Sequence, residues 1–256
     1  MQLKVIKCQS VLIFGQCGHG KTTTVNRLLN VDWFTCAART GTFLPHIKAY
    51  EQGENGLNEA VLSPYIKSRV DSTTLEEEGL FDLDTMILRQ RITQEIAWNV
   101  DSVTSSSGRL ANGVTQIRFV DMMGVGDEII TNQPYYEIYR EFVKTATHIL
   151  WITDASRRGY AEDEACLKYI ADYMGDLERF TIGLNKADSI GLQRYENPNP
   201  VPTDHQQELL REKAKIVARV FQGFLPANIT ITEKNVVPFS AYYGWNFDAL
   251  HKLFFE

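Results

Sequence analysis

A short segment near the start of the chain has the glycines and the lysine of a phosphate-binding loop. Residues 15–22 read GQCGHGKT and fit the pattern G-x-x-x-x-G-K-[ST]. The apolar run VLIF at 11–14 precedes them, and TTTVNRLLN at 22–30 follows with apolar residues at helical spacing. Glycine tolerates positive φ, so successive backbone N–H groups can turn towards a phosphate, and a helix N-terminus adds its dipole. The segment therefore predicts a strand, a loop and a helix that bind nucleotide phosphates.

The side chains and amides of this loop have separate expected roles. We expect the Lys21 ammonium to lie between the β- and γ-phosphates and the Thr22 hydroxyl to ligate Mg²⁺. Thr23 is placed to reach the α-phosphate. The backbone amides expected to face the phosphates are those of Gly18, His19 and Gly20. The loop alone predicts a nucleoside triphosphate ligand and does not separate ATP from GTP.

A second pattern, D-x-x-G, follows an apolar strand later in the chain. The segment TQIRFVDMMGVGD at 115–127 places Asp121 at the end of that strand and Gly124 three residues on. A carboxylate at a strand end can hold Mg²⁺, usually through a water, and a flexible glycine can offer its N–H to the γ-phosphate. The pattern is weak alone, and its order in the chain and its strand context give it weight.

The third pattern bears on the choice of base. Residues 185–188 read NKAD and stand directly after the apolar strand at 180–184. The Asp188 carboxylate can accept two hydrogen bonds from guanine N1–H and N2–H₂, whereas adenine would leave it unpaired at a cost of several kcal/mol. The Lys186 stem can lie over the base plane, and Asn185 can tie this loop to the phosphate loop. We therefore expect guanine.

A fourth, weaker signal lies near the end of the chain. Ser240 and Ala241 follow the apolar strand at 236–239, and an amphipathic helix with apolar residues from 247 to 254 comes next. The Ala241 N–H would meet guanine O6. The pair agrees with the three earlier motifs in order and in context.

The ordered set GQCGHGKT, DMMG, NKAD and SA resembles the translation-factor-related class of GTPases. The runs VDMMGVGD, YYEIYREF, ILWITDA and DEACLKYI are similar to its Era-like branch, which includes small ribosome-associated and stress-related bacterial GTPases. The resemblance covers residues 10–50 and 114–256 and fades between 53 and 112. It implies a Mg²⁺-dependent switch that hydrolyses GTP to GDP. A ribosomal or nucleic-acid partner is suggested by this resemblance alone.

Alternating strands and helices predict an α/β fold, here a P-loop NTPase three-layer sandwich with a mostly parallel, doubly wound sheet. We expect one GTPase (G) domain over 1–256. We expect an insertion at about 53–112, before the D-x-x-G strand, and its residues 75–100 are expected to be partly helical. The second strand is either HIKAY at 46–50, with the insertion after it, or a segment near 103–110. The insertion is either a partner-binding element or a helix that covers a sheet edge.

The residues for hydrolysis are less clearly marked than those for binding. A switch threonine would ligate Mg²⁺ and respond to the γ-phosphate, and Thr40 is preferred over Thr42 because it lies nineteen residues after Lys21. With Lys21 and Gly124, it completes the expected catalytic set. Val125 stands where Ras-like enzymes carry a water-orienting glutamine. Gly18 stands where many relatives bind K⁺ through an asparagine, so potassium activation is not expected.

Composition and charge narrow the kinds of ligand and the cellular compartment that we expect. A net charge of -6 gives no electrostatic reason to expect nucleic acid as the main ligand. The four cysteines form no C-x-x-C pair, which favours reduced thiols in a cytoplasmic protein. The first residues, MQLKVIKCQS, lack the apolar core and the small-residue cleavage site of a signal peptide, so we expect none. Apolar runs such as ILWIT at 149–153 are too short to span a bilayer.

Two functions remain open at this point. The first is a slow GTPase switch whose GTP form binds an effector through its switches or its insertion. The second is an assembly or sensor protein that binds GTP or GDP and hydrolyses little unless it self-associates. An elongation-factor fragment is disfavoured by Val125, since those factors carry histidine there, and an ATPase is disfavoured by NKAD.

Overall fold

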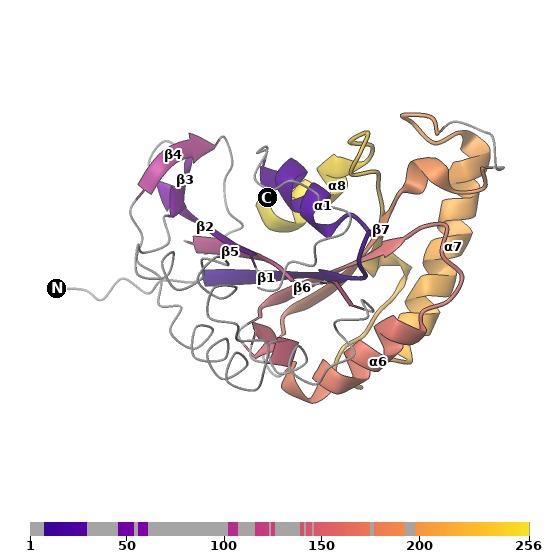
Figure 1. The fold of residues 1–256 in the computed structure, drawn as a ribbon, viewed down its shortest axis with the longest axis horizontal. Coiled ribbons are helices and arrows are strands. Elements are labelled where there is room, and N and C mark those ends of the chain that lie inside the picture. Colours follow the sequence, from indigo (N-terminus) through magenta and orange to yellow (C-terminus); the bar gives the residue numbers. More distant parts are fainter. Residues whose placement is uncertain are drawn as a thin grey trace, which may run out of the picture.

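One twisted sheet runs through the part of the chain that the structure describes (Figure 1). The structure is a computed structural model, and its described strands follow the order β4-β3-β2-β5-β1-β6-β7-β8. The residues that it describes are 8–29, 46–53, 56–60, 102–106, 116–122, 124–125, 139–140, 142–144, 146–174, 177–192 and 198–255.

Five neighbouring strands of this sheet are all parallel. In sheet order they are β5 (Gln116–Asp121), β1 (Cys8–Gly15), β6 (His148–Asp154), β7 (Arg179–Asn185) and β8 (Val236–Pro238). Because they are parallel, their carboxyl ends all lie at the same edge of the sheet. Every strand that the motifs predicted is present in this set.

Three antiparallel strands extend the sheet beyond β5. They are β2 (His46–Gly53), β3 (Gly56–Ala60) and β4 (Ser102–Ser106), and β2 pairs with both β5 and β3. The second strand is therefore the one that begins at HIKAY. A strand also forms near the alternative position, but it pairs with β3 at the sheet edge. The insertion thus adds strands to the sheet, and its predicted helical part at 75–100 lies outside the described residues.

Helices cover both faces of the sheet, which confirms the three-layer α/β sandwich. On one face lie α1 (Lys21–Leu29) and α8 (Phe247–Phe255), and on the other lie α6 (Ala161–Ile170) and α7 (Asp204–Gln222) (Figure 1). Alternate side chains of β1 enter the two cores: Val11 and Ile13 pack with α1 and α8, while Leu12 and Phe14 pack with α6 and α7. The period of two along a strand produces this division.

Aromatic stacking fixes β6 against β1 in the core. The Trp151 ring stacks on Phe14 with centroids 5.4 Å apart and planes 8° apart, and Phe221 of α7 contacts its edge at 6.3 Å. Each of these side chains is fully buried. The core therefore holds the strand ends that carry the motifs at fixed spacing.

A capping box begins α7 and connects it to the NKAD loop. The Thr203 side chain accepts from Gln206 N, and the Gln206 side chain accepts from Thr203 N. The Gln206 amide also donates to the backbone oxygens of Asp188 and Ile190, at 3.1 and 2.9 Å.

Among the described helices, none is long and apolar enough to cross a membrane.

A buried histidine makes stability depend on pH. Burial and the nearby charge of Arg179 lower the pKa of His148 from 6.5 to about 3, and its Nε2 lies 3.0 Å from Thr181 Oγ1. The unfolded chain binds the extra proton first, so stability falls as pH falls from 6.5 to about 3, by about 1.4 kcal/mol per pH unit for one proton. We expect His148→Gln to flatten this dependence in urea unfolding at pH 7 and pH 5.

The matched control for that measurement is His205→Gln, which changes an exposed histidine of α7. His19 remains in both variants, so the difference between them isolates His148. An undiminished slope in His148→Gln would show that the buried imidazole does not control acid stability.

Candidate nucleotide-binding site

The four sequence motifs meet at the carboxyl edge of the parallel sheet. The phosphate loop follows β1, D-x-x-G follows β5, NKAD follows β7 and the Ser-Ala pair follows β8. Strands β5, β1 and β6 are neighbours, and β7 and β8 continue the sheet from there. This edge is where open α/β sheets bind their ligands.

Close packing explains two glycines of the phosphate loop. Gly15 has φ 138°, and a side chain there would strike the backbone oxygen of Ile152. Gly20 has φ 89°, and a side chain there would strike the Asn185 amide nitrogen. Both positions need glycine for conformation as well as for space. The loop is therefore shaped by contacts with β6 and with the NKAD motif.

Inside the loop, the Lys21 ammonium donates to the backbone oxygen of Gln16 at 3.1 Å, and the His19 N–H donates to the same oxygen at 3.3 Å. Lys21 and His19 are both buried. Burial, together with the nearby Arg157 charge, lowers the pKa of His19 from 6.5 to about 4. The imidazole is therefore neutral at pH 7. Gly18 (φ 75°) comes directly before His19, and a Cβ at this position would meet no atom within 4 Å.

Two oxygen groups expected to bind Mg²⁺ lie together. The Thr22 hydroxyl donates to Asp121 Oδ2 at 2.6 Å. Asp121 is buried, and its Oδ1 has no hydrogen-bond partner among the described residues. Burial raises the pKa of Asp121, while the Lys21 charge and the Thr22 hydrogen bond oppose that rise. A buried carboxylate oxygen beside a hydroxyl fits a hard divalent cation such as Mg²⁺.

The D-x-x-G segment lies directly against the phosphate loop. A Cβ on Gly124 would come within 2.8 Å of Cys17 N, and the Val125 N–H donates to Gly15 O at 3.1 Å. The Val125 side chain is buried in the core that contains Tyr139. Residue 125 therefore faces the interior of the protein. Its apolar character suits that position.

Asn185 joins two loops. Its Nδ2 donates to His19 O at 2.8 Å, and its Oδ1 accepts from Ala241 N at 2.9 Å. The predicted contact between Asn185 and the phosphate loop is present. The Ala241 N–H, which the sequence assigned to guanine O6, is directed at Asn185 here, so a contact with O6 requires this amide to share or exchange that hydrogen bond.

Asp188, which the sequence predicts to select the base, is buried, and one of its carboxylate oxygens lacks a partner among the described residues. Asp188 Oδ2 accepts from Ser189 Oγ at 2.9 Å, whereas Oδ1 is buried and lacks a partner within the described part of the chain. The backbone oxygen of Asp188 is held by Gln206. A fixed carboxylate oxygen that lacks a donor is suited to a ligand N–H group.

Lys186 is oriented by an ion pair that the motifs did not predict. Its backbone is left-handed, with φ 58°, and its Nζ lies 2.8 Å from Asp154 Oδ2. Burial would raise the pKa of Asp154, but the hydrogen bonds from Lys186 and Ser156 outweigh it and hold that pKa below its usual value. Asp154 ends β6 directly opposite Asn185 at the end of β7, and this pairing of the two strands brings it within reach of Lys186.

The last loop is held from α1. Arg27 donates to the backbone oxygens of Ala241 and Tyr242, at 3.0 and 2.8 Å. Ser240 is fully buried, and its Oγ accepts from Tyr243 N at 3.1 Å. Ser240 therefore shapes this loop by a hydrogen bond between its side chain and the backbone three residues later.

The remaining predicted residues have different outcomes. Thr23 lies half-buried in the first turn of α1. The switch candidates Thr40 and Thr42 lie outside the described residues, so the choice between them stays a prediction. Sequence reasoning missed Arg27 and Asp154, which no short motif marks because each acts on a loop far away in the sequence. It also missed Gln206, although Thr203 and Gln206 have the spacing of a capping box.

Comparisons with solved structures agree with this geometry. The sequence matches no protein-family profile, and no curated protein sequence is significantly similar to it. A variant of Era from Aquifex aeolicus bound to GDP·AlF4⁻ matches 97% of this chain at a TM-score of 0.52 and 18% identity. This chain spans only 56% of that Era chain.

Two other solved proteins share the architecture. A dimerization-deficient variant of Toc33 from Arabidopsis thaliana matches 92% of this chain and 71% of its own, with a TM-score of 0.51 and 11% identity. Translation elongation factor SelB from Methanococcus maripaludis, with the GTP analogue GppNHp, matches 98% and 34%, with a TM-score of 0.50 and 13% identity.

These matches, with the parallel sheet and the loop after β1, define the class: the chain has the fold of P-loop GTPase domains. Within that class, its fold is of the type found in Era.

The Asn185 bridge can be tested by an isosteric change. In Asn185→Asp, a carboxylate oxygen replaces the amide that donates to His19 O, so a donor is lost and two acceptors face each other. We expect about 2–3 kcal/mol of destabilisation in urea unfolding. Asn246→Asp is the matched control, because Asn246 donates to Pro238 O from an exposed position and its change costs under about 1 kcal/mol. Equal losses would mean that the Asn185 bridge does not matter.

Proposed function

We propose that this protein is a guanine-nucleotide-binding switch that hydrolyses GTP to GDP and phosphate with Mg²⁺. The observation that carries the proposal is the buried Asp188 carboxylate, whose Oδ1 lacks a partner among the described residues. The Asn185 bridge to His19 ties its motif to the phosphate loop. Era, in the solved structure with the same fold, is bound to GDP·AlF4⁻.

Guanine is preferred because its N1–H and N2–H₂ donors match this carboxylate. Adenine has an acceptor at N1 and no donor at position 2, so it would leave Asp188 buried and unpaired. The Lys186 stem, held through Asp154, would cover one face of the base. Sites built around a buried polar group discriminate strongly against ligands that lack its partner.

The phosphates would bind along the loop after β1. We assign the backbone amides of Gly18, His19 and Gly20 to the phosphate oxygens, with Lys21 between the β- and γ-phosphates. Thr22 and Asp121 would hold Mg²⁺, which when bound neutralises charge on the β- and γ-phosphate oxygens. Lys21 must leave the Gln16 oxygen or share its hydrogen bonds to reach the phosphates.

For hydrolysis, water adds to the γ-phosphorus and the bond to the β–γ bridging oxygen breaks. GDP leaves with that electron pair, and the proton of the water ends on inorganic phosphate. Lys21 and the Gly124 N–H would stabilise the developing charge, and Thr40 is assigned to the first switch. Since Val125 is buried in the core, other groups would orient the water, and we expect slow turnover without a partner.

An assembly or sensor protein with little intrinsic hydrolysis is the second candidate, favoured by the burial of Val125. In either case, the effector or second copy would bind through the switches or the insertion at 53–112. We propose one G domain over 1–256, acting in the cytoplasm. A ribosomal or nucleic-acid partner rests on resemblance alone.

Base selection can be tested at Asp188. Asp188→Asn should weaken GTP and GDP binding by at least about a hundredfold and gain xanthosine triphosphate, because the amide can donate to the xanthine oxygen. Fluorescence titration with labelled nucleotides measures both. Asp204→Asn, at an exposed position that begins α7, is the control and should bind as the wild type does. Retained GTP affinity without a gain for xanthosine triphosphate would refute the assignment.

The two candidate functions differ in how hydrolysis depends on protein concentration. A switch hydrolyses GTP within one molecule, so we expect a single-turnover rate constant that is independent of protein concentration. Rapid-quench measurements over a wide concentration range, with Mg²⁺ and with EDTA, test this. A rate constant that rises with concentration would favour the assembly protein, and hydrolysis that persists in EDTA would remove the role of Mg²⁺.

A further inference from the structure

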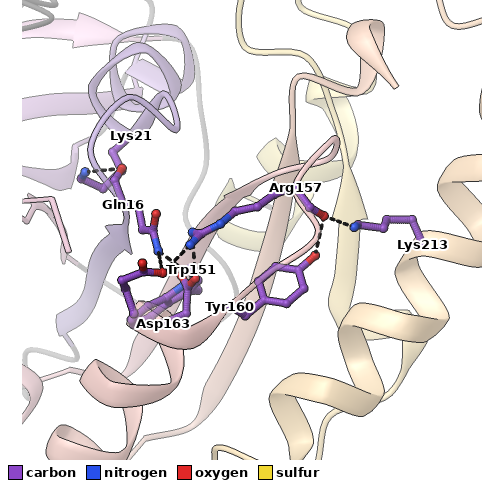
Figure 2. A network of polar contacts seen from close by, with 8 residues as sticks. Gln16, Lys21, Trp151, Arg157, Tyr160, Asp163 and Lys213 are labelled. Carbon is purple, nitrogen blue, oxygen red and sulfur yellow. Dashed lines mark hydrogen bonds and ion pairs between the residues drawn. The ribbon is translucent and has the colours of Figure 1, made fainter. Parts of the chain in front are cut away.

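A polar network joins the phosphate loop to the segment after β6 (Figure 2). The Gln16 amide donates to Asp163 Oδ2 at 3.2 Å and to Glu162 Oε2 at 3.0 Å. Arg157 binds the same two carboxylates, at 3.0 Å from Asp163 and 2.5 Å from Glu162. Apart from Gln16, which lies in the phosphate loop itself, none of these residues belongs to the four motifs. The network therefore gives the phosphate loop a contact with α6 that nucleotide recognition does not itself require.

The centre of the network is a carboxylate with no solvent exposure. Asp163 Oδ1 accepts from Trp151 Nε1 at 2.7 Å, and Oδ2 accepts from Arg157 and Gln16. Burial raises the pKa of Asp163, and the Trp151 hydrogen bond and the Arg157 charge oppose that rise. A buried carboxylate is costly unless its oxygens are bound, so this geometry holds each partner firmly.

The backbone of Arg157 is fixed from the opposite side. Its carbonyl oxygen accepts from Lys213 Nζ of α7 and from the Tyr160 hydroxyl, the latter at 3.4 Å (Figure 2). Its side chain is only 19% exposed. The backbone of Arg157 is therefore held by α7 and Tyr160, while its guanidinium is held by the two carboxylates.

The connection to nucleotide chemistry passes through the backbone of Gln16. The Gln16 carbonyl accepts from Lys21 Nζ and from His19 N, and Gln16 also forms a β-bridge with Val125. The Gln16 side chain is thus held by α6, while the Gln16 carbonyl holds Lys21, which is assigned to the β- and γ-phosphates. Fixing the side chain restricts the loop that must receive those phosphates.

We propose that Arg157 and Asp163 are positioning residues for the phosphate loop and act through Gln16. The inference rests on the proposed nucleotide binding and goes beyond it. It makes the affinity for the β-phosphate depend on Arg157 and Asp163, which lie outside the motifs. The base is held separately, by the loops after β7 and β8. Loss of the network should therefore weaken ligands with a β-phosphate selectively.

The test compares GDP with guanosine monophosphate, which shares the base and lacks the β-phosphate. Dissociation constants are measured by competition against labelled GDP, for the wild type, Arg157→Ala and Gln16→Ala. We expect each variant to raise the Kd for GDP about tenfold and to leave the Kd for the monophosphate nearly unchanged. The double variant should bind GDP no more weakly than the weaker single variant, because both changes act on the same link between the phosphate loop and α6.

Neighbouring glutamates of α6 supply a matched control. Glu162 and Glu164 are both in the first turn, with side chains 52% and 40% exposed, and both pair with a cation, at 2.5 Å to Arg157 and 2.6 Å to Lys168. Only Glu162 also contacts Gln16. Glu162→Ala should raise the ratio of the Kd for GDP to the Kd for the monophosphate, whereas Glu164→Ala should leave that ratio unchanged. This exposed pair decides the question if Arg157→Ala fails to fold.

Each outcome has a distinct meaning. If wild-type protein binds neither ligand, the proposed function fails and this inference fails with it. If the wild type binds GDP and the variants weaken both ligands by the same factor, the network supports the fold alone and the positioning role is overturned. A selective loss for GDP in Arg157→Ala, Gln16→Ala and Glu162→Ala, absent in Glu164→Ala, supports it.

Discussion

The geometry of the site depends on the buried amide of Asn185. This side chain donates to the phosphate loop at His19 and accepts from the loop after β8 at Ala241, so one residue spaces three loops. The contact also dictates its surroundings, since a side chain at Gly20 would displace the amide. Two hydrogen bonds to backbone groups are directional, and they hold the phosphate and base regions at a fixed separation.

Around this bridge, the site carries buried carboxylates that the protein leaves half satisfied. Asp121 and Asp188 each bind one hydroxyl through one oxygen, while the second oxygen lacks a partner among the described residues. Burying such groups costs stability. One faces the position assigned to Mg²⁺ and the other the position assigned to guanine, so ligand binding would recover part of that cost.

Charged residues outside the motifs supply the orientation that the motif residues need. Asp154 holds Lys186, and the Asp163–Arg157 pair holds the Gln16 side chain. Both sets come from β6 and the segment after it, which lies between the phosphate loop and NKAD because β6 is between β1 and β7 in the sheet. Strand β6 and the segment after it therefore support the site without contributing a recognition motif.

The sequence by itself determined the local units: the loop after β1 and the strands that end at Asp121 and Asn185. These depend on neighbouring residues, through glycine conformation and strand hydrophobicity. Only the tertiary structure decided that β2 begins at His46, that the insertion extends the sheet, and that Val125 faces the core. It also brought Gln16 to Asp163, 147 residues away. Such pairings depend on the order of strands in the sheet, which local sequence patterns do not encode.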